Sequence, residues 1–272
     1  MESGRKTQRA AHSAQEGRVL RGNKVKRQVD WKFIIPFLLT LAVFLFAAVK
    51  LGMLLWENYK GGREYQQIEE SVVSIAGQAD STDGRQEGFS VDFDKLRKIN
   101  PHVVGWIRIE KLGVSYPIVQ GEDNDYYLSH TFYKEENKCG SIFIEVENSK
   151  DFSDFHTFVY GHNMKDKSMF ARLNEFQEEE TLRENPQFFI YTPEGVRRYE
   201  IYSCHIAKLG TESFLYRFGA EKDYAQWQTD VKEQSLYDTG VEPKSAQSTV
   251  TLMTCTPAGS QYRFLVHGVL AE

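Results

Sequence analysis

The sequence predicts a mainly β fold, a barrel or sandwich of about eight short strands with few helices, preceded by one membrane-spanning helix. Two observations lead to this prediction. Short runs rich in β-branched and aromatic residues recur from residue 103 to residue 270, separated by Gly, Pro, Asn or Asp. Near the N-terminus, the 24 residues from Phe33 to Trp56 form an apolar run, and a span needs roughly 20 such residues.

Charge is distributed unevenly around this apolar run. Residues 1–32 carry nine Lys or Arg against three acids, a net +6, whereas residues 51–272 carry 23 basic and 35 acidic residues, a net -12. Positive charge before a span predicts a cytoplasmic N-terminus and an exported C-terminal body. A cleaved signal peptide is the alternative, but its apolar region would be only about 7–15 residues long. We therefore expect a basic cytoplasmic arm over 1–32 and an anchor in the membrane lipid over 33–56.

The rest of the chain divides into a stalk and a folded body. Residues 57–88 are expected to form the stalk, a polar helix followed by a flexible linker rich in Gly, Ser and Asp. The folded body is expected over 89–272. Short helices are expected at 92–99 and 169–176, and a longer amphipathic one from 221 to about 236. The expected strands are 104–109, 115–119, 140–144, 157–160, 188–192, 196–205, 250–254 and 264–270.

Composition argues against several classes of function. The acidic body does not suit nucleic acid, and the basic arm is explained by topology and anionic lipid headgroups. The seven histidines are scattered without C-x-x-C or H-x-x-x-H spacing, so we expect no metal site and no cofactor. Three cysteines in an exported body do not make a disulfide framework. Cys139 and Cys204 could pair, which would leave Cys255 free.

A cysteine and an arginine lie at facing ends of the last two expected strands, which the loop 256–262 joins. Side chains alternate along a strand, so pairing of the more apolar faces would project Cys255 and Arg263 to the same side at the same end. A slip of one residue would separate them. Together, a thiolate can attack a carbonyl carbon and a guanidinium can stabilise the charge on its oxygen. Taken singly, a cysteine is more often a small buried hydrophobe and a strand-end arginine a solvated charge.

A thiol nucleophile also needs a partner that handles protons, and this is usually histidine. His162 is the best candidate, since it follows a strand in the stretch Tyr160-Gly161-His162-Asn163-Met164. The glycine permits a sharp turn that exposes the next side chain at the strand end. A loop histidine that merely caps a turn is the alternative.

These motifs resemble those of the sortases, membrane-anchored cysteine transpeptidases of Gram-positive bacteria. The resemblance extends over about residues 90–272, and the anchor and the long helix before the cysteine strand are most like class B. Besides the stretch around His162, the matching segments are Val103–Ile107, Tyr116–Gly121, Asn124–Leu128, Gly140–Phe143, Asp151–Asp154, Thr251–Cys255 and the following Arg263.

The resemblance implies a closed β-barrel with Cys255 as nucleophile, His162 as general acid and base, and Arg263 as stabiliser of the oxyanion or substrate. It implies cleavage of a sorting signal in exported surface proteins through a thioacyl-enzyme. An amine, typically of the peptidoglycan precursor, then resolves this intermediate. The resemblance also implies a set of residues that line the substrate groove, namely Asn124, Leu128, Met253 and Thr254.

Two departures leave other functions open. Thr256-Pro257 follows the cysteine where class B members often have an acidic residue, and the loop to Arg263 is somewhat short. Thr256-Pro257 is closer to sortases that build pili, so a pilin amine is a second candidate acceptor. A membrane-tethered protease that hydrolyses its thioester and a surface binding module without enzymatic activity are the remaining alternatives.

Overall fold

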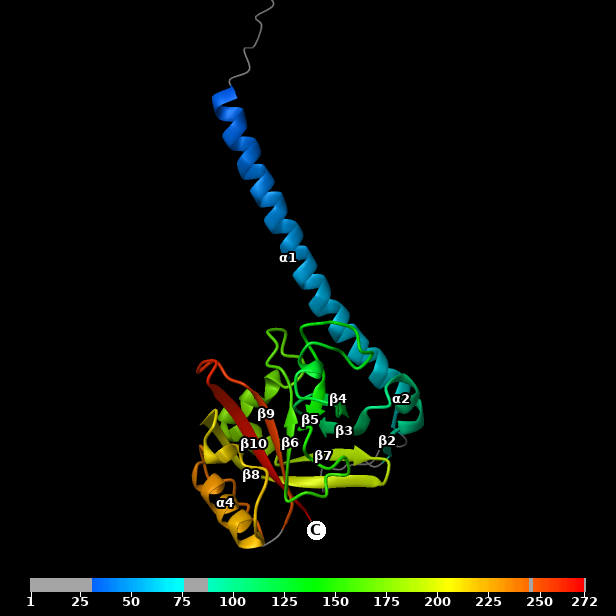
Figure 1. Cartoon of the computed structure of the whole chain (residues 1–272), viewed down its shortest axis with the longest axis vertical. Coiled ribbons are helices and arrows are strands. Elements are labelled where there is room, and N and C mark those ends of the chain that lie inside the picture. The colour runs from blue at the N-terminus through cyan, green and yellow to red at the C-terminus, as the bar shows by residue number, and fades with distance from the viewer. Residues whose placement is uncertain (1–30, 76–87, 245–246, 272) are drawn as a thin grey trace, which may run out of the picture. The chain divides into compact units, whose positions relative to one another are not determined.

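The computed structural model describes residues 31–75, 88–244 and 247–271, and Figure 1 shows its helices and strands. The chain divides into two compact units, Met1–Lys50 and Leu51–Glu272. The expected cytoplasmic arm over 1–32 falls almost entirely outside the described residues.

A long helix, α1 (Trp31–Val72), begins the described chain. Within the described residues, its segment Trp31–Met53 is the one stretch of helix long and apolar enough to cross a membrane. Large side chains of this segment are exposed, for example Phe33 at 75% and Leu39 at 70%. Exposed apolar side chains on every face of a helix suit contact with lipid, so the segment is a candidate anchor.

Eight strands form a closed barrel in the order β10-β8-β7-β3-β4-β5-β6-β9. This confirms the expected mainly β fold, and the expected strand bounds are correct to within three residues. Most neighbours are antiparallel, but β4 and β5 are parallel, as are β6 and β9. The strands are β3 (Val103–Ile109), β4 (Val114–Val119), β5 (Ile142–Ile144), β6 (His156–Tyr160), β7 (Gln187–Thr192), β8 (Gly195–Lys208), β9 (Thr249–Cys255) and β10 (Tyr262–Leu270).

Aromatic and branched side chains fill the barrel. All seven residues of β3 are buried, Arg108 among them, so the strand shows no alternation of buried and exposed positions. Gly268 allows β10 to pass close to β7 and β8, because a Cβ there would lie 2.4 Å from the Phe188 ring. At the same place β10 shifts its register against β8 between His267 and Gly268, which marks a bulge.

Short helices connect the strands. They are α2 (Phe93–Ile99), η1 (Tyr126–Leu128), η2 (Ala171–Gln177), α3 (Glu179–Glu184), η3 (Glu212–Phe214) and α4 (Glu221–Glu233). The carboxylate of Asp92 caps α2 by accepting from the Lys95 amide at 2.9 Å. α4 is the amphipathic helix expected from the sequence, and its buried side Tyr224, Trp227 and Val231 packs in a second apolar cluster with Tyr202 and Val269.

The helix expected at 169–176 is a 3₁₀ helix, η2, rather than an α-helix. Phe170, Leu173 and Phe176 are all fully buried. Residues three apart eclipse each other in a 3₁₀ helix, so this geometry points all three apolar side chains towards the core. Apolar residues at a constant spacing of three, rather than a mixture of three and four, are the sequence signal that distinguishes a 3₁₀ helix from an α-helix.

The second half of α1 packs on the barrel within the larger unit. Ile68 is fully buried, and the Tyr65 hydroxyl donates to the Gly140 carbonyl at 2.6 Å. After α1, β1 (Val73–Ile75) pairs with β2 (Phe89–Val91) outside the barrel. The expected flexible linker lies at residues outside the described chain. The stalk at 57–88 and the body at 89–272 remain predictions as domain bounds.

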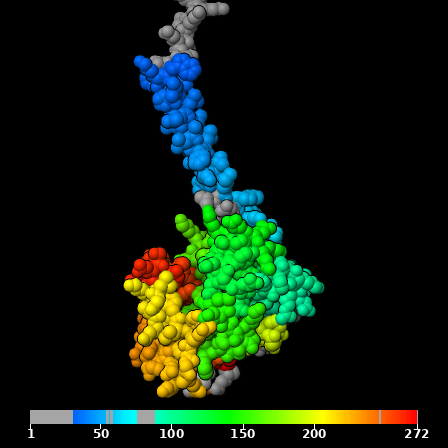
Figure 2. Space-filling view, viewed as in Figure 1, coloured from blue at the N-terminus to red at the C-terminus, as the bar shows by residue number. Residues whose placement is uncertain are grey.

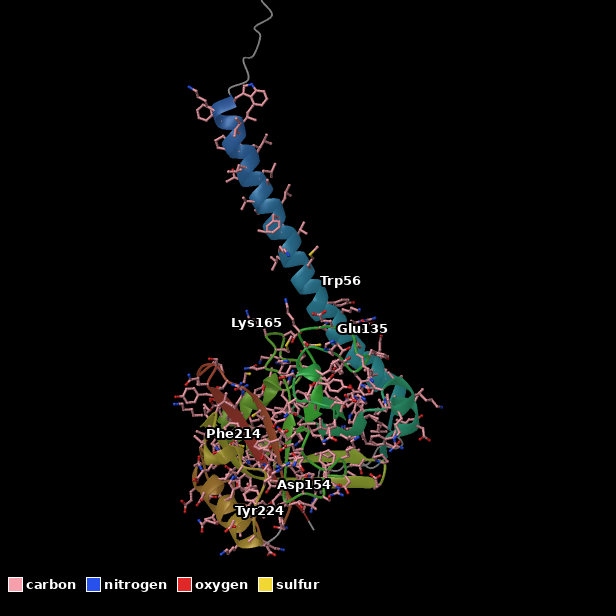
Figure 3. The ribbon with its side chains drawn as sticks, viewed as in Figure 1. Trp56, Glu135, Asp154, Lys165, Phe214 and Tyr224 are labelled. Atoms are coloured by element: carbon pink, nitrogen blue, oxygen red, sulfur yellow. The ribbon has the colours of Figure 1, made fainter. Side chains whose placement is uncertain are left out.

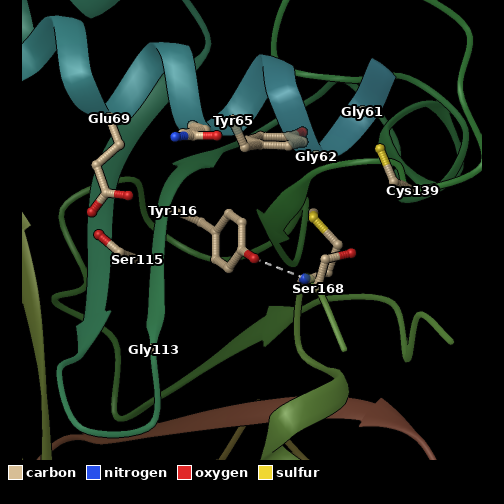
Figure 4. A pocket seen from close by; sticks show the side chains of 11 residues that line it. Gly61, Gly62, Tyr65, Glu69, Gly113, Ser115, Tyr116, Cys139 and Ser168 are labelled. Carbon is tan, nitrogen blue, oxygen red and sulfur yellow. Dashed lines mark hydrogen bonds between the residues drawn. The ribbon is translucent and has the colours of Figure 1, made fainter. Parts of the chain in front are cut away.

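A cavity of about 170 Å³ lies between α1 and the barrel (Figure 4). Gly61 and Gly62 line it from the helix, and Tyr116 and Cys139 from the body. In Figure 4 the Tyr116 hydroxyl accepts from the backbone amide of Met169, at 3.0 Å. None of the residues that line this cavity is Cys255, His162 or Arg263, so it is separate from the site described next.

Candidate active site

Cys255 and Arg263 are direct partners across the hairpin of β9 and β10. The inner faces of the two strands carry Val250, Leu252, Phe264 and Val266, which belong to the main core. Since side chains alternate, Cys255 and Arg263 share the outer face at one end of the barrel. This is the register that the apolar pattern of the two strands predicts. The loop that joins the two strands lies on the surface of the molecule, where it is red in Figure 2.

His162 reaches the same end of the barrel because β6 runs parallel to β9. Tyr160 is paired with Met253, and the Gly161 amide donates to the Met253 carbonyl at 3.1 Å. His162 and Cys255 each follow two residues after this pair, so they lie level with each other where the two strands end. The Asn163 amide group also donates to the Cys255 carbonyl at 2.8 Å, which links the loop of His162 directly to the end of β9.

The imidazole of His162 is held by backbone. Its Nε2 lies 2.7 Å from the Leu128 carbonyl, and a carbonyl can only accept, so Nε2 carries the proton of this bond. Gly140 lies against the ring: it has a φ of +56°, and a Cβ there would meet the Leu128 carbonyl at 2.8 Å and the His162 Cδ2 at 3.1 Å. A side chain at this position would therefore displace the imidazole or its acceptor.

Arg263 is anchored to the loop that precedes it. Its Nη1 donates to the Ser260 carbonyl at 2.8 Å and to the Tyr262 carbonyl at 2.9 Å. Among the described residues, these carbonyls are the hydrogen-bond partners of the guanidinium. A guanidinium has five N–H donors in a planar fork, so donors on Nε and Nη2 remain for an oxyanion or a substrate carbonyl.

The three cysteines are all free, and Cys255 alone among them is exposed. Burial raises the pKa of the Cys139 thiol to about 12 and that of Cys204 also to about 12. The thiolate is the nucleophile, so those two thiols are poor candidates. The disulfide between Cys139 and Cys204 that the sequence left open is not formed.

The four candidate groove residues differ in their placement. Leu128 is 42% exposed, and its carbonyl holds His162, while Met253 is half-buried on the face of Cys255. Thr254 is buried on the opposite face of β9. Asn124 is bound within the protein itself: its amide donates to Glu145 at 2.6 Å, and its oxygen accepts from the Val146 amide at 2.9 Å. A substrate-binding role for these residues remains a prediction.

Three residues of the site were not recognised in the sequence. Besides Asn163, the amide of Asn174 donates to the Cys255 carbonyl, at 3.2 Å. Glu145, which is 6% exposed, accepts from both Asn124 and Tyr160. The signal for Asn163 was available, because it directly follows His162. Asn174 and Glu145 have no local signal, since their partners lie far away in the sequence.

A buried polar cluster lies on the outer face of the same strands, beneath η3 and α4. Thr251 Oγ1 is 2.6 Å from His156 Nε2 and 2.6 Å from His267 Nδ1. The His205 ring stacks on His267 with ring centroids 5.0 Å apart. Phe214 of η3 and Tyr224 of α4, labelled in Figure 3, belong to the elements that cover this face. These histidines are structural neighbours of β9, whereas His162 lies at its exposed end.

An accessible thiol with a guanidinium opposite and an imidazole on the adjacent strand end is suited to one kind of chemistry. The thiol can take up an acyl group, the imidazole can exchange the protons, and the cation can stabilise the oxyanion. No group of His, Cys, Asp or Glu that could hold a metal occurs among the described residues. The barrel and its site thus define a cysteine-dependent acyl-transfer enzyme.

Comparison with known proteins agrees with this class. The sequence profile of the sortase domain matches residues 107–271. Sortase B of Listeria monocytogenes is 33% identical over 220 residues, which are 80% of this chain and 87% of the relative. The crystal structure of sortase B from Bacillus anthracis has a TM-score of 0.68 at 27% identity, over 80% of this chain and 99% of that one. Clostridium perfringens sortase B has a TM-score of 0.63 at 30% identity, over 66% and 100%.

This chain belongs to the sortase family, and within it the similarity is to sortase B. It is therefore a cysteine transpeptidase with a closed β-barrel, as the resemblance of its motifs implied.

Proposed function

We propose that this sortase cleaves a C-terminal sorting signal of exported proteins and joins the new carboxyl end to a cell-wall amine. Cys255 is the nucleophile, His162 the general acid and base, and Arg263 the oxyanion donor. The observation that carries the proposal is the register around β9, which pairs Cys255 with Arg263 on one side and sets His162 level with it on the other.

In the first half of the reaction, the Cys255 thiolate attacks the carbonyl carbon of the scissile peptide bond. The carbonyl oxygen takes the negative charge, and the free donors of the Arg263 fork stabilise it. The carbon–nitrogen bond then breaks, and protonated His162 gives its proton to the leaving amine. The products are a thioester on Cys255, a released C-terminal peptide and a neutral imidazole.

In the second half, an amine attacks the thioester carbon. His162 accepts the proton that the amine loses, the carbon–sulfur bond breaks, and Cys255 leaves as a thiolate. An amide bond has formed and the enzyme has returned to its starting state. Water would follow the same route and yield a free acid, so the outcome depends on which nucleophile reaches the thioester first.

The peptidoglycan precursor is the acceptor that we favour, because the sortase B proteins of Listeria monocytogenes and Staphylococcus aureus are relatives of this chain. A pilin amine is the second candidate, favoured by Thr256-Pro257 directly after the nucleophile. Leu128 and Met253 are candidates for contacts with the sorting signal, since both lie beside the residues of the reaction.

The cellular arrangement follows from the charge pattern. The basic residues before the candidate span Trp31–Met53 favour a cytoplasmic N-terminus, which leaves the barrel outside the membrane. An enzyme anchored there would meet exported proteins as they emerge. Protease accessibility of an epitope tag placed at either end of the chain in intact cells tests this topology.

The decisive experiment is mass spectrometry of the full chain in detergent, incubated with a panel of sorting-signal peptides with and without an amine acceptor. We expect a covalent adduct on Cys255 that the amine converts to an amide product, and no adduct on Cys255→Ala. Release of free acid alone, even with amine present, would favour the hydrolytic protease. No adduct with any peptide would contradict the proposal and favour a binding module.

A further inference from the structure

Glu145 is a buried carboxylate at the edge of the active site. It directly follows β5 and is 6% exposed. It takes part in none of the ion pairs among the described residues. Burying a carboxylate is costly unless other groups satisfy it, and here two hydrogen-bond donors do so. The identity of these two donors indicates what the carboxylate does.

The first donor comes from the segment that holds the imidazole. The Asn124 amide donates to Glu145 Oε1 at 2.6 Å. Asn124 precedes η1, and the carbonyl of Leu128, the last residue of η1, accepts from His162 Nε2. The Asn124 oxygen accepts from Val146, so the side chain cannot turn its amide group elsewhere without losing that bond. Glu145 thus fixes the start of the segment whose end orients His162.

The second donor comes from the strand that carries the imidazole. The Tyr160 hydroxyl donates to Glu145 Oε2 at 2.6 Å. Tyr160 is the last residue of β6, two residues before His162. Burial, with the hydrogen bond and charge of Glu145, raises the pKa of Tyr160, so the phenol remains a donor at any physiological pH.

We propose that Glu145 is a positioning residue for catalysis, acting on His162 through Asn124 and Tyr160. Its two oxygens join the segment that orients the imidazole to the strand that carries it, and thereby fix the imidazole relative to Cys255. Misplacement of a reacting group by about 1 Å can lower the rate about 100-fold. The inference rests on the proposed role of His162 as general acid and base.

The test compares three substitutions in the full chain. Glu145→Leu removes both acceptors at similar volume, and we expect kcat to fall about 10- to 100-fold with little change in KM. Glu145→Gln restores activity to within a few-fold of wild type, because its oxygen can accept from Asn124 while its amide donates to a rotated Tyr160 hydroxyl. Glu147→Leu is the matched control: this carboxylate is exposed two residues away, and it contacts Tyr216 and Arg217, so we expect wild-type kcat.

A double-mutant cycle separates positioning from direct contact with substrate. If Glu145 acts through Tyr160, Tyr160→Phe lowers kcat, and adding Glu145→Leu costs less than it does alone. Additive losses would overturn the proposal, as would wild-type kcat in Glu145→Leu. If Glu145→Leu does not fold, Tyr160→Phe and Asn124→Leu are measured singly, and wild-type kcat in both would equally overturn it.

A last measurement is independent of any peptide. Alkylation of Cys255 by iodoacetamide is followed over pH 5 to 9; Cys139 and Cys204 are buried and do not contribute. We expect the profile of Glu145→Leu to shift towards that of His162→Ala, while Glu147→Leu follows wild type. If wild type transfers no peptide but this shift occurs, the proposed substrate is wrong and the positioning role holds. An unshifted profile overturns the positioning role.

Discussion

Acid should destabilise this protein through the buried histidines His156, His205 and His267. Their neutral forms fit the cluster: His156 Nδ1 donates to the Leu215 carbonyl, so its Nε2 accepts from Thr251. His267 Nε2 is buried without a hydrogen-bond partner, and a proton there would have nothing to bind. Burial lowers the pKa of His156 to about 3, that of His205 to about 4 and that of His267 well below its ordinary value.

The sign follows from proton linkage. The folded-state pKa values lie below the unfolded value of about 6.5, so the unfolded chain binds more protons between these limits. The stability that the neutral histidines contribute is therefore fully present above the unfolded pKa, and it is lost as the pH falls below that value. Between pH 7 and pH 5, His156 and His205 should each remove about 2 kcal/mol from the free energy of unfolding. His267 acts in the same direction.

Urea unfolding of the full chain in detergent, followed by tryptophan fluorescence at pH 7 and pH 5, measures this loss. Trp227 reports on the region, since its ring lies 4.2 Å from His156. In His205→Gln the loss should shrink by about 2 kcal/mol, because glutamine does not titrate. His102→Gln is the control: burial lowers the pKa of His102 too, but this side chain is only partly buried, so the loss should change less than in His205→Gln. Equal pH dependence in wild type and His205→Gln would refute the linkage.

Three further outcomes are expected. Cys255→Ala abolishes peptide turnover without changing the thermal unfolding midpoint, and residual turnover would assign the nucleophile elsewhere. Arg263→Lys lowers kcat about 100-fold, because the planar guanidinium fork is replaced by a single point charge. Arg183→Lys, on the exposed face of α3, is the control and keeps wild-type kcat. Equal kcat in the two variants would remove Arg263 from the mechanism. Gly140→Ala lowers the free energy of unfolding by about 2–4 kcal/mol. The loss is smaller in the control Gly210→Ala, because Gly210 has a φ of +82° but open space around it. Equal losses in urea unfolding would show that only the backbone angle matters.

The hairpin that carries Cys255 and Arg263 could be predicted from the sequence because its information is local. Alternation of apolar residues along two strands is sufficient to set which faces pair, and the register then places Cys255 opposite Arg263. The strand bounds were predictable for the same reason. Only the closure of the strands into a barrel, rather than a sandwich, required the resemblance to a known family.

What the sequence could not reveal depends on long-range partners. Asn124 matches a groove position, yet its side chain is bound by Glu145, 21 residues further along the chain. The histidine cluster gathers rings from β6, β8 and β10, which no spacing rule connects. Gly140 could be recognised as a matching residue, but its role against the His162 ring depends on a contact that only the folded chain makes.

The parallel pairing of β6 with β9 also bears on the order in which the site is assembled during folding. The bond between Asn163 and Cys255 joins residues 92 positions apart, and such distant contacts form late because a long loop must first be closed. With the topology proposed above, the loop of His162 would cross the membrane well before the strand of Cys255. We therefore expect the thiol to gain its partners only as the last two strands complete the barrel, so that the emerging chain cannot modify its neighbours before it has folded.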